Sequence, residues 1–127
     1  VVILRQVANR QQLAHAEGLF FDWLESLPLG IRRSDPRTMR SAVWRRLGYN
    51  NTGVIANYSI GQSDFMWYLR LLPRVRWAYA TVWRLLPPGG FTSDDHDIPA
   101  LISSFDGCGA QRNVFLQASE PDWRTGG

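Results

Sequence analysis

Two histidines are the strongest metal-ligand candidates in this sequence, and both have acidic neighbours. His15 begins the triplet His15–Glu17, and His96 lies within the acidic run Asp94–Asp97. A facial metal triad needs two histidines and one carboxylate on one face of the metal. The triplet falls in a predicted helix, where its two end residues point about 200° apart. The acidic run reads as a solvated loop in which nothing enforces converging ligands. The sequence therefore predicts no metal site in these residues.

Other reactive groups lack the partners that catalysis requires. The only cysteine, Cys108, rules out an internal disulfide and has no assignable base, so a partly buried structural thiol is the favoured reading. The segment Ser103–Gly107 is not a nucleophile elbow, because no glycine stands two residues before the serine. Gly89-Gly90 and Gly107–Gly109 do not have the spacing of a phosphate-binding loop. The sequence thus contains no motif that supports a hydrolase or a nucleotide-binding function.

Charge and hydropathy exclude two further classes of partner. The net charge is +3, and all 14 basic residues are arginines, scattered among Asp and Glu without a long basic run. We therefore expect no nucleic-acid partner. No apolar run approaches the roughly 20 residues that span a membrane. A single cysteine and no export signal favour a reducing, cytoplasmic location.

Helix signals are clearest in the N-terminal third. Asn9 and Gln12 form a predicted capping box after a short β-branched strand at 1–4. Pro28 and Gly30 end the helix that follows. Its apolar stripe consists of Leu13, Ala16, Phe20, Trp23, Leu24 and Leu27.

The middle of the chain alternates helices and strands. Asp35-Pro36 predicts the start of a short helix running to about Leu47, and a strand is expected over 54–58. Ser63 caps a helix that stops before Pro73, and Pro73 opens another. The apolar face of this last helix is predicted to comprise Val75, Ala78, Tyr79, Val82, Trp83 and Leu86.

A loop over 87–97 and a strand over 101–105 complete the predicted elements. This order argues for a mixed α and β domain rather than a bundle or a sandwich. With 127 residues and 45% hydrophobic content, the chain forms one domain or part of one. The fold class expected is α+β.

Four segments together resemble the phytanoyl-CoA dioxygenase-like branch of the Fe(II)/2-oxoglutarate oxygenases. They are Phe20–Leu24, Gly61–Arg70, Leu101–Gly109 and Pro121–Gly127. The resemblance implies N-terminal helices and the first strands of a double-stranded β-helix, or jelly roll, whose barrel is incomplete in this chain. In that family the last segment leads into the strand that carries His-x-Asp. Residues 1–127 are therefore expected to be a single partial domain, the N-terminal part of such a fold.

The resemblance also implies a set of cofactor-binding residues. Ser103 would face the 2-oxoglutarate pocket and donate a hydrogen bond to a carboxylate, with Phe105 as an apolar wall. Asp106 and Arg112 would organise the turn that follows, and Trp123 would border the metal-bearing strand. The alternative for each residue is a strand merely packed in a sheet.

The function implied is that of an oxidoreductase. It is the N-terminal portion of a dioxygenase that uses Fe(II) and 2-oxoglutarate to hydroxylate a small or lipid-like organic substrate, and it is inactive as an isolated fragment. The metal ligands of that family are not among these residues, so the fragment binds no cofactor by itself. The alternative is a non-catalytic α+β protein-interaction module. The sequence specifies neither the substrate nor the oligomeric state.

Overall fold

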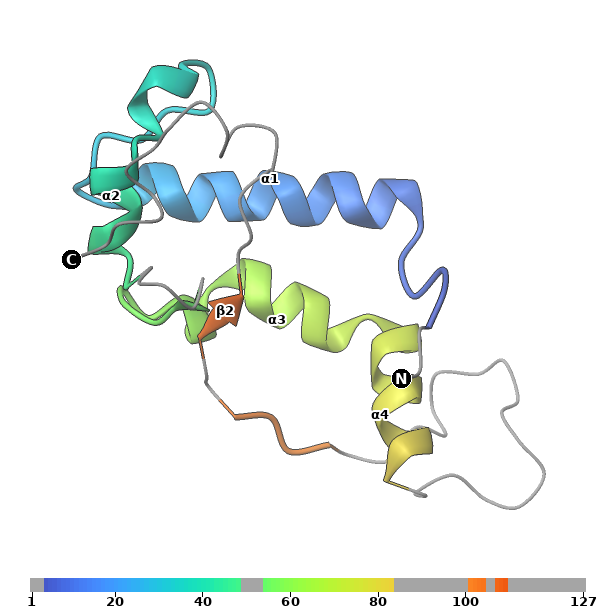
Figure 1. Cartoon of the computed structure of the whole chain (residues 1–127). Helices are drawn as coiled ribbons and strands as arrows, with labels where there is room; N and C mark the ends of the chain where they lie inside the picture. Colours follow the sequence, from blue (N-terminus) through green and yellow to red (C-terminus); the bar gives the residue numbers. More distant parts are fainter. Residues whose placement is uncertain (1–3, 49–53, 84–100, 105–106, 110–127) are drawn as a thin grey trace.

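The computed structural model describes residues 4–48, 54–83, 101–104 and 107–109, which form a layer of helices beside a small sheet (Figure 1). The helices are α1 (Arg10–Ser26), α2 (Ser41–Arg46), α3 (Asp64–Leu71) and α4 (Pro73–Val82). Two 3₁₀ turns, η1 (Pro36–Thr38) and η2 (Ile60–Gln62), precede α2 and α3, and the strands are β1 (Val54–Ile55) and β2 (Cys108–Gly109).

Helix α1 begins at the predicted capping box. The Asn9 side chain accepts a hydrogen bond from the Gln12 backbone N–H, and the Gln12 side chain accepts one from the Asn9 N–H, both at 2.8 Å. These two bonds satisfy backbone donors that a helix start otherwise leaves without partners. The capping-box prediction is confirmed.

Helices α1 and α3 pack against each other in antiparallel directions (Figure 1). The rings of Phe20 and Phe65 lie 5.0 Å apart, and those of His15 and Tyr68 lie 4.6 Å apart. Ser63 caps α3 as predicted, by accepting a bond from the Met66 N–H at 3.3 Å. The N-cap residues in the sequence therefore predict where each of these two helices begins.

The core lies at the end of α1 where α2, β1 and η2 meet. It consists of Leu24, Leu29, Ile31, Leu47, Ile55 and Ile60. They come from α1, the loop after it, the end of α2, β1 and η2, so burial of these six side chains joins the helical layer to β1.

Strand β1 is linked to α2 at its far end. The Leu47 carbonyl accepts bonds from the N–H groups of Ala56 and Asn57, at 3.2 and 3.3 Å. The Asn57 amide donates to the Arg46 carbonyl at 3.1 Å. Since the last carbonyls of a helix have no partners within the helix, β1 completes the C-terminus of α2.

The two strands form a short antiparallel sheet. Val54 pairs with Gly109, and Ile55 pairs with Cys108. A Cβ atom on Gly107 would lie 2.4 Å from the Ile55 carbonyl oxygen, so only glycine permits this approach. Residues 107–109 therefore contact β1, in the middle of the sequence, through their backbone atoms.

Several predicted elements differ from the observed ones. The strand expected over 54–58 contains only Val54–Ile55, and the helix expected after Pro36 is divided into η1 and α2. Residues 101–104, expected to be a strand, do not form one in the structure. Leu4 is not in a strand, and residues 1–3 lie outside the described residues.

Helix α4 starts at Pro73 as predicted, but its apolar face is not buried. Tyr79, Val82 and Trp83 are 58%, 71% and 69% exposed, whereas Ala80, on another side of the helix, is fully buried. The prediction that Trp83 belongs to the core is wrong.

The N-terminal segment meets α4 through one long-range bond. The Arg74 guanidinium donates to the Gln6 carbonyl at 2.8 Å, across 68 positions of sequence. Gln6 has a φ of 58°, in the left-handed region that non-glycine residues seldom adopt. This bond holds the segment before α1 against the start of α4.

The described elements are mainly helical with one two-stranded sheet, and the α+β class stays a prediction. A jelly roll requires two facing sheets of several strands. The described part of the chain contains two strands, so the jelly roll stays a prediction.

Candidate functional site

Of the five residues that the oxygenase resemblance nominates, the structure describes one. Ser103 is half-buried, and its hydroxyl donates to the carbonyl of Ser104 at 3.3 Å. Phe105, Asp106, Arg112 and Trp123 lie outside the described residues.

The extended segment 101–104 shows an alternation of burial. Leu101 and Ser103 are half-buried, whereas Ile102 and Ser104 are exposed. Such a period of two is that of an extended backbone with one face against the protein. Ser103 is thus one of the two more buried residues of this segment, and its role in 2-oxoglutarate binding stays a prediction.

Cys108 follows this segment and belongs to β2. It is half-buried and packs against the core cluster beside Ile55. Burial raises the pKa of its thiol, which disfavours the thiolate that a nucleophile or metal ligand requires. This agrees with the structural role favoured from the sequence.

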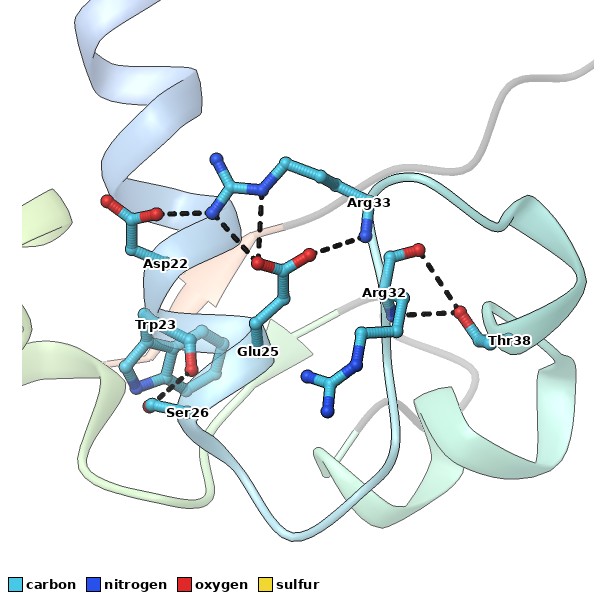
Figure 2. A network of polar contacts seen from close by, with 7 residues as sticks. All are labelled: Asp22, Trp23, Glu25, Ser26, Arg32, Arg33 and Thr38. Atoms are coloured by element: carbon cyan, nitrogen blue, oxygen red, sulfur yellow. Dashed lines mark hydrogen bonds and ion pairs between the residues drawn. The ribbon is translucent and has the colours of Figure 1, made fainter.

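The largest polar network surrounds Arg33, just after α1 (Figure 2). Its guanidinium donates to the Glu25 carboxylate at 3.0 and 3.1 Å and also to Asp22. The Arg33 backbone N–H donates to the same Glu25 carboxylate at 2.6 Å. The guanidinium further lies 5.6 Å from the centre of the Phe21 ring.

In this network the positive charge of Arg33 is paired with two carboxylates. The hydrogen bonds from Arg33 hold the pKa of Glu25 below its usual value, and those from Glu25 and Asp22 raise the pKa of Arg33. With both carboxylates occupied, Arg33 ties the turn after α1 back to the helix rather than offering a ligand site. Sequence reasoning missed it, although Asp22 and Glu25, three residues apart on one helix face, were a visible signal.

The turn that Arg33 fixes continues into a second small network. The Arg32 backbone N–H donates to the Thr38 hydroxyl at 2.9 Å (Figure 2). That hydroxyl also donates to the Asp35 carbonyl at 2.7 Å. Asp35 also accepts bonds from the Arg37 side chain at 2.8 and 2.9 Å, which lower the pKa of its carboxyl. These contacts order η1 and bind nothing else.

A second arginine, Arg70, has a different environment. It is half-buried on α3, its guanidinium donates to the Gly61 carbonyl, and it lies 5.2 Å from the centre of the Trp67 ring. The Trp67 indole N–H donates to the Gln62 side-chain oxygen at 3.3 Å. No carboxylate in the described part of the chain pairs with Arg70.

The metal-ligand candidates do not converge. His15 is exposed on α1, with its ring edge-on to Tyr68, and Glu17 lies on another side of the helix. His96 lies outside the described residues. Among the residues described, no three His, Cys, Asp or Glu side chains form a group able to hold a metal ion. These residues do not fit an Fe(II) centre.

Comparison with known proteins identifies no relative of this chain. No protein-family model, no curated protein and no solved structure matches this chain. Within the described ranges, no helix is both long enough and apolar enough to cross a membrane.

Proposed function

We propose that this chain is the N-terminal portion of a non-haem Fe(II)/2-oxoglutarate-dependent dioxygenase that hydroxylates a small or lipid-like organic substrate in the cytoplasm. The observation that carries the proposal is the pairing of Cys108 and Gly109 with β1, next to the close approach of Gly107 to the Ile55 carbonyl. In the resembled family, helices support a sheet at this point of the sequence, and the strand before the metal ligands belongs to that sheet.

The inward face of 101–104 also supports the proposal. Ser103 is half-buried there, and a hydroxyl at this place is suited to donate a hydrogen bond to a carboxylate of 2-oxoglutarate. The described residues do not fit iron, so the proposed chemistry belongs to a longer polypeptide. The fragment contributes the helical support and one candidate donor.

The test uses the protein encoded when the reading frame is extended past residue 127. With Fe(II) and 2-oxoglutarate, this protein is expected to release succinate. Ser103→Ala should raise the KM for 2-oxoglutarate about tenfold or more, the effect of one hydrogen bond to a charged carboxylate. Ser104→Ala, on the exposed face, is the matched control and should leave the KM unchanged.

Two results would refute the proposal. One is an extended protein that folds but releases no succinate with Fe(II) present. The other is a reading frame that ends at Gly127.

A second candidate function is a non-catalytic protein-interaction module. It is favoured by the exposed apolar side chains of Tyr79, Val82 and Trp83 on α4, since exposed aromatic groups are enriched at protein interfaces. A stable 127-residue protein from a reading frame without further codons would favour this function over the oxygenase.

A further inference from the structure

Arg70 stands out among the buried or half-buried charged groups because the described chain supplies it with one acceptor. A guanidinium has five N–H donors, and here the Gly61 carbonyl is the protein acceptor. Arg33, by contrast, is bonded to two carboxylates. Partial removal of a charge from water without a counter-ion is unfavourable, so an anion at Arg70 would stabilise the arrangement.

The guanidinium is also held in place before any ligand arrives. Trp67 lies beneath it at 5.2 Å, and the Trp67 indole is itself fixed to Gln62 at 3.3 Å. A planar cation fixed by a ring and a carbonyl loses little further freedom on binding. The site is therefore preorganised.

Helix geometry places this pair away from the α1 interface. Phe65 and Tyr68 contact α1. Because an α-helix turns about 100° per residue, Trp67 and Arg70 lie on the opposite side of α3. The site therefore does not face α1, and both side chains are partly exposed.

The surrounding charge favours an anion. From Phe65 to Ser93 the sequence contains four arginines and no Asp or Glu. A region of one sign raises the local concentration of ions of the other sign. Asp64 is the nearest acidic residue in sequence, and it lies about 120° from Arg70 around the axis of α3.

We propose that Arg70, held over Trp67, is a binding site for a carboxylate group, with the Gln62 amide as a neutral second donor. The Gln62 oxygen is engaged by the indole, and no acceptor in the described ranges takes its amide N–H groups. A carboxylate matches the fork of a single guanidinium, whereas phosphate commonly requires more positive charge. The site does not rest on the oxygenase function.

The test is an NMR titration of the 127-residue chain with malonate, followed at the indole N–H signal of Trp67. A Trp67→Phe variant identifies that signal among the six tryptophans. The signal is expected to shift saturably with millimolar malonate. Arg70→Gln should weaken binding at least about tenfold, the loss of one charge-assisted bond pair. Arg70→Lys, which keeps the charge without the fork, should weaken it less.

Arg45→Gln is the matched control, since Arg45 is exposed on α2 and carries the same charge. It should bind malonate as the unchanged protein does. An equal loss in Arg45→Gln would indicate general charge attraction and overturn the site. No saturable shift in the unchanged protein, or tighter binding of inorganic phosphate than of malonate, would overturn the carboxylate assignment. Circular dichroism of each variant confirms that the helices are retained.

Discussion

Gly107 lies so close to Ile55 that a Cβ atom on the glycine would be 2.4 Å from the Ile55 carbonyl oxygen and 2.9 Å from the Val54 side chain. The nearer atom is backbone of a paired strand, which cannot move aside without breaking the pairing. Close packing of two main chains, rather than an unusual φ angle, therefore explains why glycine occupies this position.

Gly107→Ala is expected to lower the free energy of unfolding by about 1–3 kcal/mol or more, the usual cost of forcing atoms into a packed site. Gly18→Ala is the matched control, because a Cβ there meets nothing within 4 Å and the residue is inside α1. It should stabilise the protein by about 0.5–1 kcal/mol. Urea unfolding of both variants checks the prediction, and changes of the same sign would contradict it.

Leu24 and Leu13 belong to the same predicted apolar stripe but differ in burial. Leu24 is fully buried in the core, and Leu13 is 55% exposed. Leu24→Ala should cost about 2–5 kcal/mol by leaving a cavity. Leu13→Ala should change stability by about 0.5 kcal/mol or less. Thermal unfolding separates the two, and equal losses would show that the α1 face is assigned incorrectly.

Glu25 gives the stability a predictable pH dependence. Its pKa in the folded protein is below the usual 4.5, because Arg33 donates hydrogen bonds to the carboxylate. The stabilisation is therefore fully present above about pH 4.5 and is lost as the pH falls through the folded pKa.

The difference in melting temperature between the unchanged protein and Glu25→Gln should accordingly be largest near about pH 7 and should shrink steadily as the pH falls below about 4.5. Glu17→Gln on the exposed side of α1 is the control, since the structure gives Glu17 no ion pair among the described residues. A difference for Glu25→Gln that persists in acid would contradict the assigned contact.

Trp83→Ala should change the free energy of unfolding by about 0.5 kcal/mol or less, because most of the side chain is exposed. The periodicity of α4 alone predicted a core position, for which the loss would be about 3–5 kcal/mol. A melting curve distinguishes these values directly, and a large loss would restore the sequence-based assignment.

Local signals predicted helix starts well. Asn9 with Gln12, Ser63, and Pro73 each act within one helical turn, so the sequence contains all the atoms involved. Burial on α4 could not be predicted in this way. A period of three and four shows which side chains share a face, but what covers that face depends on distant segments.

The candidate sites illustrate the same limit. Ser103 was nominated by its position in a motif; it is half-buried, and its role stays a prediction. The Arg33 and Arg70 environments were not predicted. Each depends on a turn bringing an arginine against a helix or a carbonyl eight or nine residues away. Spacing along the sequence predicts such side-chain contacts only when the geometry of the turn is already known.

The bond between Arg74 and the Gln6 carbonyl has a kinetic consequence. Closing a loop of 68 residues costs about 2 kcal/mol more in chain entropy than closing the 8-residue loop between Glu25 and Arg33, because each doubling of length adds about 0.6 kcal/mol. A single exposed hydrogen bond contributes about 1 kcal/mol and does not offset that difference. The contact therefore forms only after the packing of α1 on α3 has brought both ends together. The amides nearest the start of α1 should exchange with solvent early, and the segment before them should be the first to detach as the protein warms.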